Sequence, residues 1–297
     1  SYPLGVYKNK VDGYIDALIK ELSYIGESIK GKRLDSIYIG GGTPTSLTAE
    51  QLDRLMTNVG EIFDLSALME YTVEAGRPDT ITADKLKVIK NNGAGRISIN
   101  PQTMNDKTLK LIGREHTVDD IKRVYAEARE AGHKNINMDL IMGLTGETED
   151  DAANTFEKVL ALEPDGITIH VLALKHASQL NRDGADIFSG AHDFGRVTEK
   201  YESIFRQKGY MPYYLYRQKY ILGGLENSGW CKKNCVCIYN IRMMDDTSTC
   251  WAAGAGSVSK RCYYGTSRTE RRADSKNIAE YIDGIDACIA KKSEIMD

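Results

Sequence analysis

The sequence contains no cysteine before Cys231, and all six of its cysteines lie between Cys231 and Cys288. In a chain of 297 residues, this distribution is typical of free thiols in a reducing compartment and argues against a disulfide scaffold. There is also no run of about eighteen apolar residues, and the segment SYPLGVYKNK lacks the basic-then-apolar order of a secretory signal. We therefore expect a cytoplasmic protein without a membrane span.

Proline and net charge are low as well, with six prolines and a formal charge of -3. The chain has no excess of positive charge, which nucleic-acid-binding proteins use to bind phosphates, so we expect no nucleic-acid partner. With 41% hydrophobic and 27% charged residues, the composition is that of a globular protein that buries a substantial core.

Short β-branched and aromatic runs recur in the first part of the chain, each after an amphipathic helical stretch. Their spacing suits a strand, a helix and two short loops, which predicts a parallel α/β sheet. Such a sheet stays open and doubly wound or curls into a complete or partial barrel, with ligands at the carboxyl ends of its strands. The predicted elements are a helix at 11–29 and strands at 35–39, 69–74, 95–100, 134–140 and 166–171.

The regular alternation of predicted strands and helices ends after about residue 174. This change predicts a core over 1–175 and an appended smaller region over 176–297. In this region we expect a loop at 181–191, a helix at 194–205, segments of β character through Gly265, and a final helix at 275–289. Asp274 or Ser275 is the expected N-cap of that last helix.

The stretch YIGGGTPTSLT joins the strand at 35–39 to a helix, with Thr48 as N-cap and Gln51 completing a capping box. Bare backbone of this kind exposes N–H groups to a carboxylate or phosphate and carbonyls to an amine. The absence of Gly-Lys-Ser/Thr argues against a nucleotide P-loop. The structural alternative is a tight turn between strand and helix.

Polar residues close the other predicted strands, namely Glu74, Asn100 with Gln102, Asp139, and His170. Burying a carboxylate in a parallel strand is costly unless it is paired or hydrogen-bonded, so we interpret these residues as one functional rim. Alternatively, Asp139 caps a helix or bonds a backbone amide, and His170, left unassigned, is a satisfied core histidine. Arg114 could be a solvated charge at a helix end.

The chain carries six motifs in this order: YIGGGTPTSLTAEQL, EYTVEAGRPDTIT, RISINPQTMNDKTLKLIGREHT, NMDLIMGL, HVLALKHAS and GAGSVSK. In this order they resemble those of the radical S-adenosylmethionine (SAM) enzymes of the oxygen-independent coproporphyrinogen III oxidase family. GRPDTIT, NPQTMND and LALKHAS together resemble its HemZ-type branch, the coproporphyrinogen dehydrogenases. The resemblance implies a partial (β/α)6 barrel that binds SAM and a 4Fe-4S cluster, with a smaller C-terminal α+β region that covers the substrate.

The resemblance also implies the SAM contacts, some of which serve a second SAM molecule in relatives. Gly41, Gly42 and Thr43 are expected to bind the methionyl part of SAM. GAGSVSK is similar to a late glycine motif that closes over SAM, through Gly254 and Gly256, although a bulge or turn is the structural alternative. The remaining implied contacts are Glu74, Gln102, Arg114, Asp139 and Ala173.

The implied reaction starts with an electron donor that reduces the cluster, which cleaves SAM to methionine and a 5′-deoxyadenosyl radical. The radical takes a hydrogen from a substrate propionate, and loss of CO2 and one electron leaves a vinyl group. Two such steps convert coproporphyrinogen III, the porphyrinogen substrate, to protoporphyrinogen IX.

The sequence departs from the family in lacking the cluster motif C-x3-C-x2-C. We interpret the first barrel strand and this motif as missing from the sequence, and we expect the chain as given to form no cluster and not to turn over. Cys231, Cys235 and Cys237 offer C-x3-C-x-C, one residue short, so we predict no metal ligands among them. Relocated cluster ligands are the alternative.

Three rival interpretations and one basic segment stay open. A haem chaperone of the same family carries His-Asn…Tyr-Trp where this chain has YNIRMM at 239–244, which argues against haem storage. A haem-degrading radical methyltransferase shares the fold, and a non-radical barrel enzyme would use the glycine loop for a phosphate. The segment RTERR at 268–272 is a solvated charged face or a contact for porphyrinogen carboxylates.

Overall fold

The computed structural model describes residues 8–172, 193–217, 225–245 and 248–296, which fall into two compact units. Unit 1 comprises residues up to Glu74, Asp84–Ala94 and the chain from Cys237 onward, and unit 2 comprises Ala75–Ala83 and Gly95–Val236. Among the described helices, none has the length and apolar character that crossing a bilayer requires. The functional division at residue 175 stays a prediction, and the loop predicted at 181–191 lies outside the described residues.

In unit 1, strand β1 pairs in parallel with β2, so that Ser36 lies opposite Glu70. Helix α3 starts with the capping box predicted from the sequence, because Thr48 Oγ1 accepts from the amide of Gln51 and Gln51 Oε1 accepts from the amide of Thr48. The elements of this unit are η1 (Lys8–Lys10), α2 (Val11–Ser28), β1 (Ser36–Ile39), η2 (Pro44–Ser46), α3 (Ala49–Ile62), β2 (Glu70–Ala75), α4 (Ala83–Asn91), α10 (Ile238–Met244), β8 (Val258–Cys262), β9 (Thr269–Ala273), α11 (Ile278–Asp283) and α12 (Ile285–Ser293).

The end of the chain corrects two predictions. The single helix expected at 275–289 is two helices, α11 and α12, which meet at Gly284. A Cβ at position 284 would lie 2.8 Å from the carbonyl oxygen of Glu280, so the absence of a side chain permits the break. The N-cap is Asn277 rather than Asp274 or Ser275, since its Oδ1 accepts from the backbone amides of Ala279 and Glu280.

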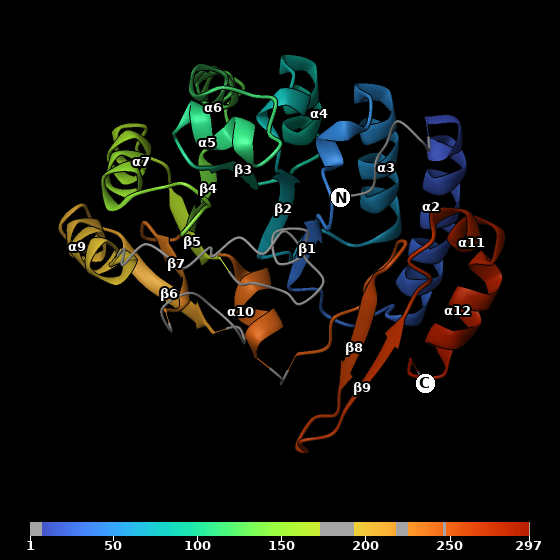
Figure 1. The fold of residues 1–297 in the computed structure, drawn as a ribbon. Helices are drawn as coiled ribbons and strands as arrows, with labels where there is room; N and C mark the ends of the chain where they lie inside the picture. Colours follow the sequence, from blue (N-terminus) through green and yellow to red (C-terminus); the bar gives the residue numbers. More distant parts are fainter. Residues whose placement is uncertain (1–7, 173–192, 218–224, 246–247, 297) are drawn as a thin grey trace, which may run out of the picture. The chain divides into compact units, whose positions relative to one another are not determined.

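Unit 2 is built on five strands in the order β3-β4-β5-β7-β6. The first three are parallel, and β7 and β6 join them antiparallel. Figure 1 shows α6, α7 and α9 on one side of these strands. The elements are η3 (Pro78–Thr80), β3 (Arg96–Gln102), α5 (Asp106–Leu111), α6 (Val118–Glu130), β4 (Asn135–Met142), α7 (Glu149–Ala161), β5 (Gly166–Val171), α9 (Phe194–Gln207), β6 (Met211–Tyr216) and β7 (Asn227–Cys231).

Side chains on the three parallel strands of unit 2 alternate between an apolar and a polar face, as period-2 geometry requires. The apolar face is fully buried and consists of Ile97, Ile99, Ile136, Met138, Ile167 and Ile169. The opposite face is polar along the length of the strands, not only at their ends as the sequence suggested. It carries Ser98, Asn100, Asn137, Asp139, Thr168 and His170.

Candidate functional site

The structure requires a glycine at the first two of the three positions that follow β1, but not at the third. A Cβ on Gly40 would lie 2.2 Å from Cε1 of Tyr38 and 2.7 Å from Oε2 of Glu74, so these two side chains leave no room for one. Gly41 has a φ of +84°, which disfavours any other residue. At Gly42 no atom of the described residues lies within 4 Å of where a Cβ would stand. The loop is therefore fixed at its first two glycines and open at the third.

Glu74 fastens this loop from the neighbouring strand β2. Its Oε2 accepts hydrogen bonds from the amide of Gly41 and from the phenol of Tyr38, both at 3.3 Å. The structure thus brings together two of the residues singled out from the sequence. Thr43 lies between the glycines and η2, and its carbonyl accepts from the amide of Ser46 at 2.8 Å.

Gln102 and Asp139 lie on adjacent strands in unit 2, where β3 contains a bulge. Ile99 pairs with Met138 and Gln102 with Leu140, so two residues of β3 lie opposite the single residue Asp139. Gln102 adopts a φ of 69°, a strained value for a residue with a side chain. Its side chain is only 9% exposed, and its Oε1 has no hydrogen-bond partner among the described residues. Strain and an unsatisfied buried acceptor are both typical of a ligand site.

Asp139 is held by polar neighbours on the same face of the sheet. Its Oδ1 accepts from Nδ2 of Asn137 at 2.6 Å, and its Oδ2 lies 3.7 Å from Nε2 of His170. Burial by itself raises the pKa of this carboxyl, but bonding to His170, the charge of that ring and a bond from Thr168 outweigh burial and lower the pKa below its ordinary value. Asp139 is therefore an ionised acceptor at neutral pH, and it caps no helix.

Arg114 follows helix α5 and turns back onto the loop after β2. Its Nη1 donates to the carbonyl of Gly76 at 3.2 Å, so the guanidinium is partly buried rather than solvated. Nearby, Nδ1 of His116 lies 3.2 Å from Oδ1 of Asp79, and His116 is only 3% exposed. Sequence reasoning missed the pairing of His116 with Asp79, because the two residues are far apart in the chain.

The predicted residues therefore occur as two sets. Unit 1 brings together the glycine loop and Glu74. Unit 2 places Gln102 and Asp139 on adjacent strands, with Arg114 bonded to Gly76. Ala173 lies outside the described residues.

The late glycine motif forms a turn, as its structural alternative proposed. The amide of Ser257 donates to the carbonyl of Gly254 at 3.0 Å, and both Gly254 and Gly256 have positive φ. The amide of Gly254 also donates to Oε2 of Glu21 on α2 at 2.9 Å. Glu21 forms an ion pair with Lys292, and both residues are fully buried. Sequence reasoning missed this pair.

The cysteine cluster offers no metal centre among the described residues, where no three His, Cys, Asp or Glu side chains come together to hold an ion. Burial raises the pKa of the Cys231 thiol to about 11 and also raises that of Cys235. Cys237 donates from Sγ to Oε1 of Glu70 at 3.4 Å. Raised thiol pKa values disfavour the thiolate that binds metal.

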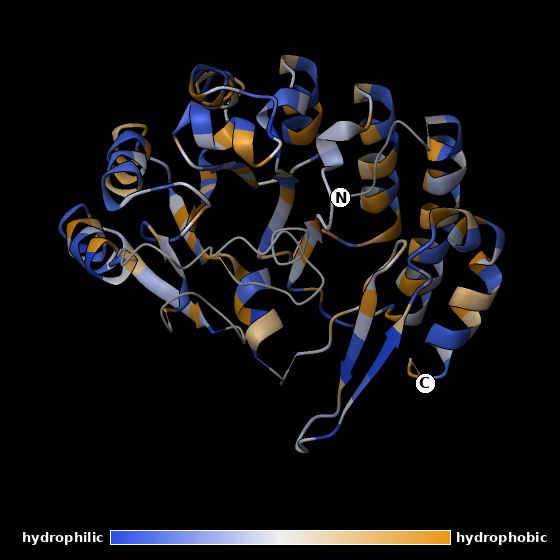
Figure 2. Ribbon diagram, in the orientation of Figure 1, coloured by the Kyte–Doolittle hydropathy of each residue, from blue (hydrophilic) through white to orange (hydrophobic). Residues whose placement is uncertain are grey.

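The basic segment RTERR forms most of β9, which Figure 2 shows as almost wholly hydrophilic. Arg268 pairs with Glu270 two residues on, and Arg272 pairs with Glu294 at 3.2 Å. These guanidinium groups already have acidic partners within the chain, which agrees with a solvated charged face.

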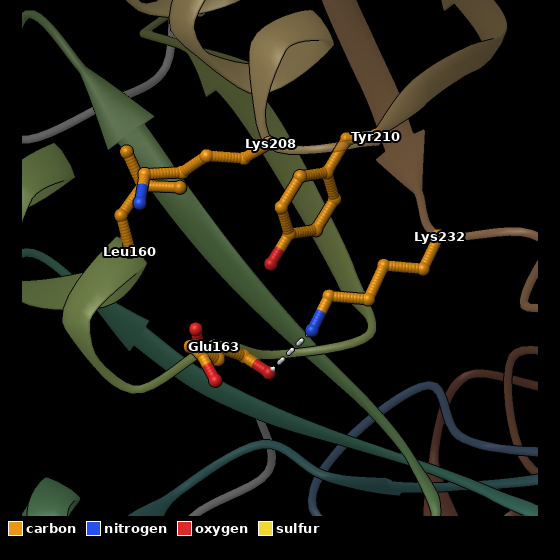
Figure 3. Close-up of a pocket in the computed structure, with 5 residues that line it drawn as sticks. All are labelled: Leu160, Glu163, Lys208, Tyr210 and Lys232. Carbon is orange, nitrogen blue, oxygen red and sulfur yellow. Dashed lines mark hydrogen bonds between the residues drawn. The ribbon is translucent and has the colours of Figure 1, made fainter.

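A pocket of about 250 Å³ lies in unit 2 and is lined by Leu160, Glu163, Lys208, Tyr210 and Lys232 (Figure 3). Nζ of Lys232 donates to the carbonyl of Glu163 at 3.0 Å, as the dashed line shows. Glu163 precedes the first residue of β5, so the pocket lies at the amino end of that strand. Ligands of parallel sheets bind at the carboxyl ends, which separates this pocket from the candidate site.

Comparison with known proteins identifies the family. Residues 10–159, half of the chain, match the model of the radical SAM superfamily, and the chain belongs to this superfamily. It is 39% identical, over 95% of its length, to the oxygen-independent coproporphyrinogen-III oxidase-like protein HemZ of Bacillus subtilis. It is also 39% identical, over 58% of its length, to the haem chaperone HemW of Lactococcus lactis.

Comparison with solved structures confirms the predicted fold. The coproporphyrinogen III oxidase HemN of Escherichia coli superposes on 94% of this chain with a TM-score of 0.72 and 22% identity. The fold is thus the radical SAM type of partial α/β barrel with a small C-terminal region. The chain spans 57% of the HemZ protein, 44% of the HemW protein and 63% of the HemN chain.

Proposed function

We propose that this chain binds SAM at the carboxyl ends of its strands and belongs to an enzyme that oxidatively decarboxylates the propionates of coproporphyrinogen III to vinyl groups, giving protoporphyrinogen IX. The observation that carries the proposal is the glycine loop, whose Gly41 amide donates to Glu74 while no described residue fills the space beside Gly42. Similarity to the HemZ protein over 95% of the chain supports the choice of reaction.

The residues present fit the polar groups of SAM, which are an ammonium, a carboxylate, two ribose hydroxyls and an adenine. Backbone amides of the glycine loop suit the carboxylate, because exposed N–H groups in such turns bind anions. In unit 1, Glu74 is an acceptor suited to such an ammonium or hydroxyl group, and in unit 2 the ionised Asp139 is another. Gln102 offers an Oε1 that lacks a partner among the described residues, and Arg114 offers guanidinium donors. Ala173 is proposed as a further contact.

The described residues do not supply ligands for a 4Fe-4S cluster, since no suitable group of side chains comes together among them. SAM and a reduced cluster supply the one-electron chemistry in this superfamily, and the protein binds and orients the reacting groups. The share that we assign to this chain is to hold SAM through donors and acceptors fixed on rigid strands, beside a porphyrinogen substrate. An electron donor is a further proposed partner.

The chaperone alternative is less well supported. The similarity to HemW covers a smaller share of the chain than the similarity to HemZ at the same identity. Helix α10 has no histidine, and its Tyr239 stacks on Tyr38 with ring centroids 4.2 Å apart, so this tyrosine is engaged within the chain.

Calorimetric titration with S-adenosylhomocysteine, a stable analogue of SAM, tests the binding site. We expect binding by the wild type and a loss of roughly ten- to a hundredfold for Glu74→Gln and Asp139→Asn, because each removes a charge-assisted hydrogen bond. Glu61→Gln and Glu115→Gln alter exposed carboxylates and should bind as the wild type does. Binding of phosphorylated sugars in place of the analogue would support the non-radical rival and contradict our proposal.

The reaction itself is measured on the natural gene product under anaerobic conditions, with coproporphyrinogen III, SAM and a reductant. We expect two CO2 and one protoporphyrinogen IX for each substrate consumed. A parallel titration with haem separates the rival role. A stable one-to-one complex with a sharp Soret band, without decarboxylation, would favour the chaperone.

A further inference from the structure

Helix α10 is anchored to the start of β2 by a buried carboxylate. Glu70 is 7% exposed and accepts hydrogen bonds from the amide of Ile238 and from Sγ of Cys237, at the first turn of the helix. Near the other end of α10, Nη2 of Arg242 donates to Oδ2 of Asp35 at 3.0 Å. Two carboxylates, Glu70 and Asp35, therefore anchor a helix of only seven residues, none of which is fully buried.

Tyr239 projects from this anchored helix onto Tyr38 of β1. The two rings lie with centroids 4.2 Å apart and planes within 18° of parallel, a close stacked pair. The Tyr38 hydroxyl in turn donates to Oε2 of Glu74, the oxygen that also accepts from the amide of Gly41. A continuous series of contacts thus leads from α10 to the glycine loop, and every member belongs to unit 1.

Gly40 shows how tightly this arrangement is packed. A Cβ there would collide with both the Tyr38 ring and the Glu74 carboxylate. The Tyr38 ring therefore cannot tilt toward the loop without moving Gly40. Tyr239 stacks on the same ring, and this contact favours the Tyr38 rotamer whose hydroxyl reaches Glu74.

We propose that Tyr239 is a positioning residue for the ligand site at the glycine loop. It acts by holding Tyr38, and through Tyr38 it sets the orientation of Glu74 and the conformation of Gly41. Tyr239 itself does not exchange a proton at neutral pH, since burial, followed by nearby thiols and the carboxylate of Glu74, raises its pKa to about 12. The proposal rests on the proposed SAM site only for the identity of the ligand.

Hydrogen–deuterium exchange without ligand tests the positioning directly. Tyr239→Leu should speed exchange of the Gly41 amide by roughly tenfold, the factor that corresponds to losing an aromatic pair of about 1.4 kcal/mol. Tyr239→Phe keeps the stack and should exchange as the wild type does. Tyr264→Leu is the matched control, because Tyr264 is fully exposed in the segment between β8 and β9. Unchanged exchange at Gly41 in Tyr239→Leu would overturn the proposal.

A double-mutant cycle read by calorimetry separates positioning from a general loss of structure. Tyr239→Leu should weaken binding of S-adenosylhomocysteine by about tenfold in the wild type, but by less than about twofold in a Tyr38→Phe background, where the hydroxyl that reaches Glu74 is already absent. Equal losses in both backgrounds would contradict the proposal. Failure of the wild type to bind the analogue would refute the SAM site, whereas the exchange result decides the role of Tyr239 independently.

Discussion

Nδ2 of Asn137 lies 2.6 Å from Oδ1 of Asp139, two residues further along β4. The same nitrogen donates to Oγ of Ser98 on β3, and Oδ1 of Asn137 accepts from the hydroxyl of Thr168 on β5. Three adjacent strands therefore hold one amide, and that amide orients the carboxylate. Functional groups fixed in this way on rigid strands need little reorganisation when a ligand binds.

Alanine substitutions at Gly41 and Gly42 are predicted to have different effects on stability. Gly41→Ala should lower the free energy of unfolding by about 1–2 kcal/mol, because a side chain is disfavoured at φ +84°. Gly42→Ala should leave the stability within about 0.5 kcal/mol of the wild type, since the new methyl meets no atom of the described residues, yet weaken binding of S-adenosylhomocysteine. Chemical denaturation and calorimetry measure the two effects. Full affinity in Gly42→Ala would mean that the ligand does not use this space.

Gln102 is predicted to strengthen ligand binding while lowering the free energy of unfolding. Gln102→Gly relieves the positive φ and removes the unsatisfied Oε1, so the free energy of unfolding should stay unchanged or rise by up to about 1 kcal/mol while affinity for the analogue falls. Glu163→Gly is the matched control, with a φ of 52° at the amino end of β5. In this variant the free energy of unfolding should likewise stay unchanged or rise, while the affinity for S-adenosylhomocysteine stays that of the wild type. A marked loss of stability in Gln102→Gly would show that the residue is structural.

The buried pair of Lys292 and Glu21 is predicted to dominate the stability of unit 1. Lys292→Met leaves Glu21 buried without its counter-charge, which should cost about 3–5 kcal/mol of unfolding free energy. The neighbouring Lys291 is exposed, so Lys291→Met should change it by less than about 0.5 kcal/mol. Adding Glu21→Gln to Lys292→Met should recover much of the loss. If the single variant is as stable as the wild type, the pair is not a stabilising anchor.

His116 predicts a dependence of stability on pH. Burial lowers the pKa of His116, and the positive charges of Arg114 and Arg77 lower it further. The hydrogen bond to Asp79 raises this pKa but does not outweigh the lowering. Below pH 6.5 the unfolded chain takes up a proton that the folded chain does not, so the unfolding free energy should fall as pH decreases toward the folded pKa. The contribution is at most about 1.4 kcal/mol per pH unit.

Denaturation of wild type and His116→Gln across pH 5 to 8 checks this. The variant should lose part of the slope, and Glu115→Gln, which alters an exposed neighbour, should retain it. An identical slope in His116→Gln and the wild type would remove His116 as the cause.

The local parts of the structure could be predicted from the sequence. Strand periodicity placed β1 to β5 within about two residues, and the Thr48–Gln51 capping box follows from residue types alone. What escaped prediction depends on contacts between distant parts of the chain. More than 200 residues separate the members of two such pairs, Tyr38 with Tyr239 and Glu21 with Lys292. The periodicity of the sequence does not predict contacts over this separation.

The candidate site was predictable in part for the same reason. Glycines and carboxylates at strand ends mark a rim, and similarity to a known family gave them roles. The strained Gln102 and the bulge of β3 were not visible, because they depend on the register between strands rather than on either strand alone.

Apolar and polar side chains alternate along β3, β4 and β5. The residues that form the buried core are therefore different from those that form the polar face of the sheet. The apolar positions, such as Ile97 and Ile99, are buried behind the sheet, while the polar positions on the other face, such as Ser98 and Asn100, hydrogen-bond to one another. An engineer could therefore rewrite one set for a new substrate and leave the other untouched. Such a scaffold should accept new chemistry at a low risk of misfolding.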